Sequence, residues 1–165
     1  MKKSKISMVL LTIFLIISIS ACGKVGEKIA QKGVEKAVEK ATGGKVDISN
    51  DGGKIEVDGQ SFAFGEKLSW PKDAMGDLPE PKAVVNAVMQ GEENKGSMVI
   101  LSGFEDGKGY VQKLKDMGYA DVMNMEDTQG FVYIGKKTIN DQKSAVVNIT
   151  YNLESKDGSI TYGLE

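Results

Sequence analysis

The sequence predicts an α+β fold, in which an N-terminal spacer helix and a short β-meander precede an antiparallel sheet with one helix packed on a face. Helical apolar spacing over 24–41 and alternation of apolar and polar residues over 45–65 predict the first two parts. Five strand-like runs around one helical pattern predict the third. We therefore divide the 165 residues into five segments: 1–21, 22–44, 45–65, 66–82 and 83–165.

The first segment has the three parts of an export signal. Lysines at 2, 3 and 5 precede an apolar run that begins at Ile6, and small residues follow it. The run from 6 to 21 is 16 residues long, which is short for a hydrocarbon core of roughly 30 Å. An uncleaved membrane span is the alternative interpretation.

The end of this segment reads Ile19-Ser20-Ala21-Cys22 and resembles a bacterial lipobox. The resemblance implies export, cleavage between Ala21 and Cys22, and a diacylglycerol thioether on Cys22. Two acyl chains anchor a protein stably to membrane lipid, so we expect the chain at the extracytoplasmic face of a cell membrane. A plain secretory signal with an incidental cysteine is the other alternative.

The segment 22–44 is predicted to be a lipidated N-terminus and a Lys/Glu-rich spacer helix that ends at Gly43-Gly44. Its apolar stripe is narrow and made mostly of small residues. Lysines recur at every fourth position from 24 to 40. This row either stays solvated or faces anionic headgroups.

The meander of 45–65 is predicted from turn residues between alternating runs. Asp58-Gly59 is a strong hairpin signal. The segment 66–82 contains all three prolines and is predicted to be an irregular connector. The layout, with Ala41-Thr42-Gly43-Gly44-Lys45-Val46-Asp47, looks like that of small surface lipoproteins of bacteria, a resemblance that implies no activity.

The segment 83–165 is predicted to follow the order β-β-α-β-β-β. Strands are expected over 83–89, 98–104, 131–135, 145–151 and 160–164. Asp106 is the predicted N-cap of the helix, and Gly118 its stop. Whether 45–65 joins the same sheet is left open.

The composition excludes several classes of site. The chain has no His and no Arg, so imidazole catalysis and bidentate phosphate recognition are absent. Without residues 1–21 the net charge is −5, which argues against nucleic acid as a partner. We expect no enzyme and no cofactor.

Two ligand sites are possible from the residues alone. Asp47, Ser49, Asp51 and Asp58 imitate the oxygen ligands of a calcium loop, although a hairpin turn explains the same residues. Trp70 and Tyr119 are candidate aromatic platforms for a cell-wall glycan, or else core residues.

Two other groups of residues are expected to have structural roles. Met117, Met123 and Met125 are interpreted as core-filling residues. The carboxylates at 121, 126 and 127 are interpreted as an acidic loop.

The expected function is non-catalytic. An envelope protein could dock on an exposed sheet face, in which case a contiguous apolar patch is expected. The alternative is a binding module for a cell-wall glycan or a cation such as calcium, for which a concave site is expected.

Overall fold

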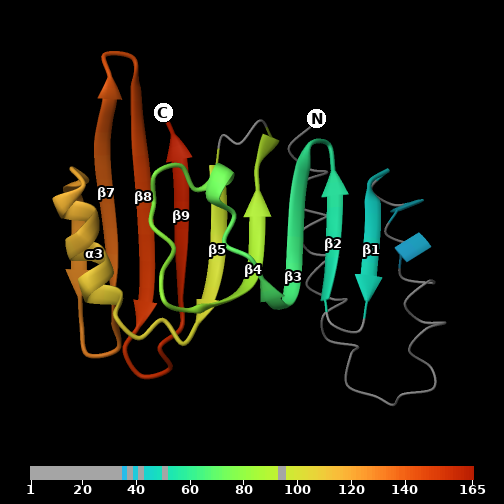
Figure 1. The fold of residues 1–165 in the computed structure, drawn as a ribbon, viewed down its shortest axis with the longest axis horizontal. Coiled ribbons are helices and arrows are strands. Elements are labelled where there is room, and N and C mark those ends of the chain that lie inside the picture. Colours follow the sequence, from blue (N-terminus) through green and yellow to red (C-terminus); the bar gives the residue numbers. More distant parts are fainter. Residues whose placement is uncertain (1–34, 37–38, 41–42, 50–51, 93–95) are drawn as a thin grey trace.

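The computed structural model describes residues 35–36, 39–40, 43–49, 52–92 and 96–165. Nine strands form one antiparallel sheet in the order β1-β2-β3-β4-β5-β9-β8-β7-β6 (Figure 1). The strands are β1 (Lys45–Ser49), β2 (Gly52–Val57), β3 (Gln60–Leu68), β4 (Val84–Gln90), β5 (Gly96–Ser102), β6 (Ala120–Glu126), β7 (Gly130–Asn140), β8 (Lys143–Asn152) and β9 (Gly158–Leu164). The element order also includes a short 3-10 helix, η1 (Lys72–Ala74), and the α-helix α3 (Gly107–Asp116).

The predicted α+β class is wrong, because the described chain is mainly β. The meander β1–β3 is continuous with the later strands through the β3–β4 pairing, in which Phe62 lies opposite Met89. The strand β6 was not predicted. The helix α3 lies at the β6–β7 end of the nine-stranded sheet (Figure 1), so it covers only part of one face of an open sheet.

Local signals for the β2–β3 turn and for the start of α3 are confirmed. Asp58 and Gly59 both have positive φ, at 49° and 77°, as a two-residue type I′ turn requires. Their turn sets the β2–β3 register, in which Val57 lies opposite Gln60. The predicted N-cap is also confirmed, since Asp106 Oδ1 accepts a 2.9 Å hydrogen bond from the Gly109 N–H.

One core lies on the face of the sheet that α3 and the connector between β3 and β4 cover (Figure 1). From α3 it contains Tyr110, Val111 and Leu114. The strands β5, β7, β8 and β9 contribute buried side chains at alternate positions, as the two-residue period of a strand dictates. The buried residues on β5, β7, β8 and β9 are Val99, Leu101, Phe131, Tyr133, Ala145, Val147, Ile149, Tyr151, Ile160 and Tyr162.

The connector belongs to this core. Trp70, Met75 and Leu78 are all buried in it. Aromatic rings continue the packing, because Phe104 meets Tyr110 and Tyr151 edge to face, with centroids 5.4 and 5.5 Å apart. The connector therefore covers the sheet as well as linking β3 to β4, and the first residues of the predicted segment 66–82 belong to β3.

Parts of the predicted N-terminal organisation lie outside the described residues. These are the signal segment, the lipobox with Ala21 and Cys22, and most of the spacer helix. Residues 35–36 and 39–40 are helical, as predicted. Within the described ranges, no helix has the length and apolar character needed to cross a membrane.

Candidate functional site: the open face of the sheet

The register assigns every strand residue to one of two faces, because directly opposed residues in an antiparallel pair point to the same side. One side is the covered core described above. On the other side two rows of residues run across the strands from β6 to β3. The first row is Met125, Val132, Thr150, Ser159, Ile100, Ala87 and Phe64, and the second is Met123, Ile134, Asn148, Thr161, Met98, Met89 and Phe62.

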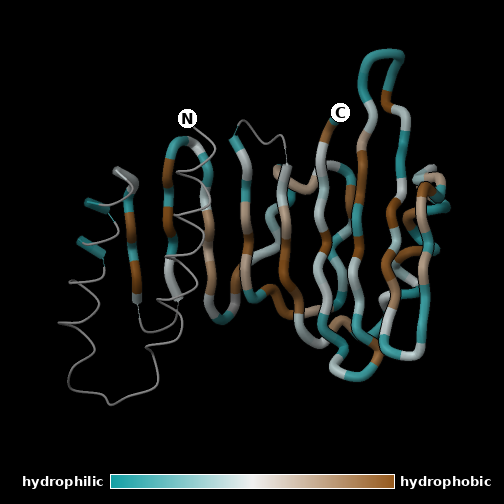
Figure 2. The backbone as a smooth tube through the Cα atoms, turned by 180° about the vertical axis from the view of Figure 1, so that it is seen from behind, coloured by the Kyte–Doolittle hydropathy of each residue, from teal (hydrophilic) through white to brown (hydrophobic). Residues whose placement is uncertain are grey.

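We call this second side of β4–β9 the open face. Figure 2 shows it from behind the view of Figure 1, with hydrophobic segments along the strands and no described helix over β4–β9. Several large apolar side chains on this face are exposed to solvent and do not belong to the core. Their exposed fractions are 52% for Val84, 38% for Met89, 40% for Ile100, 43% for Met123 and 59% for Met125.

The open face is apolar at its two sides and hydroxylic between them. Val84, Met89 and Ile100 belong to β4 and β5, whereas Met123 and Met125 belong to β6. Thr150, Ser159 and Thr161 lie on the strands between them. Methionine suits a docking surface, because its unbranched side chain adapts to different partners.

A shallow groove of about 640 Å³ lies at the β6–β9 end of the open face. Met125, Val132, Thr150 and Ser159, which form one row, line it together with residues of the adjoining turns. Because this row carries both apolar side chains and hydroxyl groups, the groove offers a ligand apolar contacts and a few hydrogen-bonding groups.

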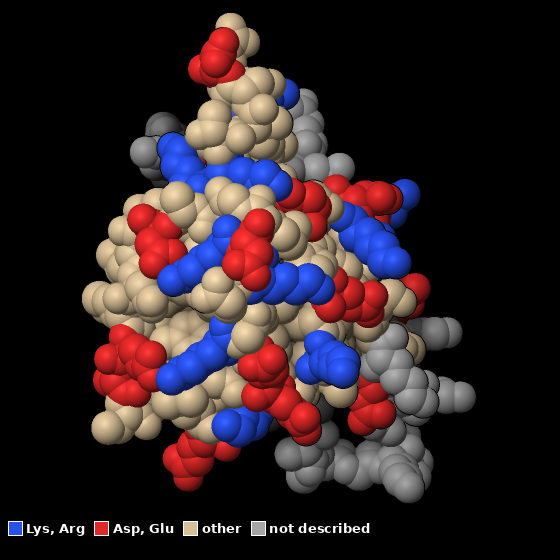
Figure 3. Space-filling model, turned by 60° about the vertical axis from the view of Figure 1, so that its left-hand side comes forward, with Lys and Arg blue, Asp and Glu red and all other residues tan. Residues whose placement is uncertain are grey.

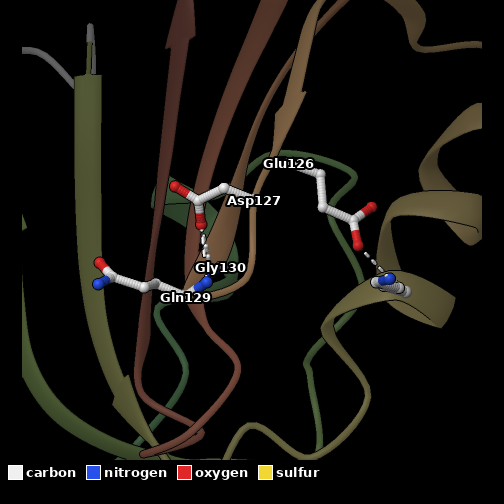
Figure 4. Close-up of polar contacts among 5 residues, drawn as sticks. Glu126, Asp127, Gln129 and Gly130 are labelled. Carbon is white, nitrogen blue, oxygen red and sulfur yellow. Dashed lines mark hydrogen bonds and ion pairs between the residues drawn. The ribbon is translucent and has the colours of Figure 1, made fainter.

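The carboxylates at the groove rim are already engaged (Figure 4). Asp127 Oδ1 accepts hydrogen bonds from the N–H groups of Gln129, at 2.8 Å, and Gly130, at 3.0 Å. Glu126 points toward α3 and forms an ion pair with Lys108. These groups therefore hold the β6–β7 turn and α3 in place. Among the described residues, no cluster of three or more potential ligands could hold a metal ion.

The calcium ligands predicted from the sequence are not brought together in the described part. Asp47 and Ser49 are exposed on β1, and Asp51 lies outside the described residues. Asp58 lies in the turn after β2, at the opposite end of that strand from the Ser49–Gly52 pair. Six strand residues span roughly 20 Å, so Asp58 and Ser49 are far apart.

The two candidate glycan platforms are core residues. Trp70 and Tyr119 are both buried, and neither ring offers a face to solvent. The Tyr119 hydroxyl donates a 2.6 Å hydrogen bond to Asp77 Oδ1. Burial raises the pKa of Tyr119, and the nearby Asp77 carboxylate raises it further.

Asp77 also accepts from Lys137, whose Nζ lies 2.5 Å from Asp77 Oδ2. Burial alone would raise the pKa of Asp77, but the hydrogen bonds from Lys137 and Tyr119 outweigh it and hold the pKa below its usual value. This arrangement fastens the connector to the sheet. Tyr110 adds a second fastening by donating to the Pro79 carbonyl at 2.7 Å.

The sequence interpretation missed the residues that form the open face. Met123 and Met125 were interpreted as core-filling, yet both are exposed on an edge strand. Met117 is partly buried against the core. The expected acidic loop is the strand β6 and its following turn. The alternation Met123-Asn124-Met125 was the available strand signal.

Comparisons with protein family models, with curated proteins and with solved structures gave no match for this chain.

Proposed function

We propose that this chain is a lipid-anchored protein of the extracytoplasmic membrane face, and that it docks another exported protein on the open face of its sheet. The role is non-catalytic. The lipobox resemblance at Ile19–Cys22 supports the anchor. The observation that carries the docking role is the set of exposed apolar side chains on β4, β5 and β6.

Burial energetics explain why such a face favours a protein partner. Covering apolar surface contributes roughly 25 cal/mol per Å², and the five exposed side chains span the sheet from β4 to β6. A flat surface of this breadth suits a folded partner better than a small molecule, which binds in a deep pocket. The groove at the β6–β9 end is shallow by comparison.

The alternative ligands have less support. A glycan platform needs exposed aromatic faces, whereas Trp70 and Tyr119 are buried. A calcium site needs six to eight oxygens converging on one point, and Asp58 lies far from Ser49.

Site-specific photo-crosslinking on intact cells tests the proposal. A photoreactive residue at Ile100, on the open face, is expected to capture one reproducible exported protein. The matched control carries it at Lys113, which is exposed on α3. Capture of the same protein from both positions, or of none from Ile100, would contradict the docking face.

The Cys22→Ala variant tests the anchor in the same cells. Without the thioether, the protein is expected to leave the membrane fraction and to lose its crosslinked partner. Unchanged partition of this variant into detergent would show that another feature holds the chain at the membrane.

A further inference from the structure

The two edge strands of the sheet, β1 and β6, differ in whether side chains cap their outward backbone groups. At the β1 edge, helical residues cover backbone donors that point away from the sheet. The Ile48 N–H donates to Glu35 Oε1 at 3.1 Å, and the Val46 N–H donates to Glu39 Oε1 at 3.4 Å. Because an open row of N–H groups is a template for strand addition, these two carboxylates close the edge.

The β6 edge has no such cover within the described residues. The Asp127 N–H donates to the Gly130 carbonyl, so the alternation of an antiparallel ladder turns the backbone groups of Asn124 and Glu126 outward. All seven residues of β6 are exposed. The strand contains neither Pro nor Lys, the residues that commonly guard an edge.

The regularly paired part of this edge is short. A bulge between Asp121 and Met123 interrupts the pairing with β7, which leaves Met123–Asp127 as the regularly paired segment before the turn. A strand that adds here has about five residues to pair with, so the partner is limited to a short extended segment.

The three carboxylates along β6 and its following turn are already engaged inside the chain. Lys115 lies 2.8 Å from Asp121, and Lys108 pairs with Glu126. Asp127 accepts from the turn that follows it. Figure 3 shows lysines and acidic residues interleaved over this side of the molecule. Because two of these carboxylates are paired with lysines, the edge does not select strongly for a basic or an acidic segment, and a second copy of the same edge meets little charge repulsion.

We propose that β6 pairs antiparallel with β6 of a second copy of this chain, about a two-fold axis at Met125. The outward backbone groups of Asn124 then bond to those of Glu126 of the partner subunit, and the reverse pair forms by symmetry. On the α3 side, the Asn124 amide can donate to the carboxylate of Glu126 of the partner subunit. On the open face, the two Met125 side chains become direct neighbours.

The pairing would extend the surface on which docking takes place. Both copies turn their open faces to the same side, because the two-fold axis is perpendicular to the sheet. Met125 forms one wall of the groove, and Met125 of the partner subunit would extend it. The pairing itself rests only on the β6 edge and does not require the docked protein.

A cysteine at the two-fold axis tests the proposal in the full chain. Opposed residues that are not hydrogen-bonded have Cα atoms about 4.5 Å apart, which suits a disulfide. After mild oxidation of membranes, Met125→Cys is expected to give at least about tenfold more disulfide-linked dimer than Met123→Cys. Met123 is the matched control, because it shares the strand and face but lies opposite Asp127 of the partner subunit.

Three results would overturn the proposal. Met125→Cys could give no more dimer than the unsubstituted chain, in which only an unlipidated Cys22 carries a thiol. It could give the same yield as Met123→Cys. It could instead give a mixed disulfide with a different protein, which would assign the edge to a heterologous strand.

A second variant separates edge pairing from contact between faces. The N–H of Asn124 points outward, so Asn124→Pro removes no bond to β7, and proline is tolerated at such edge positions. In the Met125→Cys background it is expected to reduce the disulfide dimer at least about tenfold, with an unchanged melting temperature. An undiminished dimer would show that the copies meet through another surface.

Discussion

The Tyr119 hydroxyl donates a 2.6 Å hydrogen bond to Asp77 Oδ1, and this bond joins the connector to the residue that precedes β6. The two residues are separated by 42 positions in the chain. Lys137 on β7 pairs with the other carboxylate oxygen, and its ammonium lies 5.5 Å from the centre of the Tyr119 ring. One carboxylate thus ties three segments together at the edge of the core.

Removal of the Asp77 carboxylate should therefore loosen the connector. Asp77→Asn is expected to lower the free energy of unfolding by about 1 kcal/mol. A hydrogen bond to a charged group contributes less to stability where solvent screens the charge. Urea titration of the purified protein measures the change. In a double-mutant cycle with Tyr119→Phe the losses should be less than additive; full additivity would mean that the two residues do not interact.

The same carboxylate should make stability depend on pH. Its pKa is lowered in the folded state, so its contribution is present above the ordinary Asp value of about 3.9 and is lost as the pH falls through the lower folded value. The stability difference between the unsubstituted chain and Asp77→Asn should be constant from pH 6 to 8 and shrink below about pH 4. A difference that grows on acidification would contradict this assignment.

Local elements were predictable because short-range rules set them. Asp58-Gly59 specified its hairpin turn, and Asp106 specified the start of α3. The strand β6 was missed because its acidic ends suggested a loop and its alternation covers only three residues. The pairing of β5 with β9 joins segments about 60 residues apart, and no local pattern encodes it.

The open face illustrates a different limit. Alternation shows which residues share a face, as Met89 and Met98 do across β4 and β5. It does not show whether other elements cover that face. Coverage depends on where α3 and the connector pack, which is decided by tertiary contacts such as Tyr119 with Asp77. The exposed apolar patch could therefore be named as a possibility but not located.

The β1 edge offers a prediction on protection of backbone amides. Glu35→Ala is expected to accelerate hydrogen exchange at Ile48, and Glu39→Ala at Val46, because each substitution frees an outward N–H. Lys36→Ala is the matched control, since Lys36 lies in the same helical segment and is exposed. Exchange monitored by NMR would contradict the edge cover if all three variants behaved alike.

The connector also depends on a glycine packed against the sheet. Gly76 has a φ of +58°, and a Cβ built there overlaps the ring of Tyr162 on β9. Gly103 has nearly the same φ, +62°, but nothing lies within 4 Å of its Cβ position. Both Gly→Ala variants carry the strain of a left-handed backbone, about 1 kcal/mol, and only Gly76→Ala adds the steric conflict.

Comparison of the two variants isolates that conflict. Gly76→Ala is expected to lower the free energy of unfolding by about 1–3 kcal/mol more than Gly103→Ala, the usual cost of overpacking. Thermal or urea unfolding of both proteins measures the difference. A smaller ring at the same place offers a rescue, because Tyr162→Leu should remove most of the excess loss in the Gly76→Ala background. If Gly76→Ala lowers the free energy of unfolding no more than Gly103→Ala does, then Gly76 does not lie in close contact with the Tyr162 ring on β9.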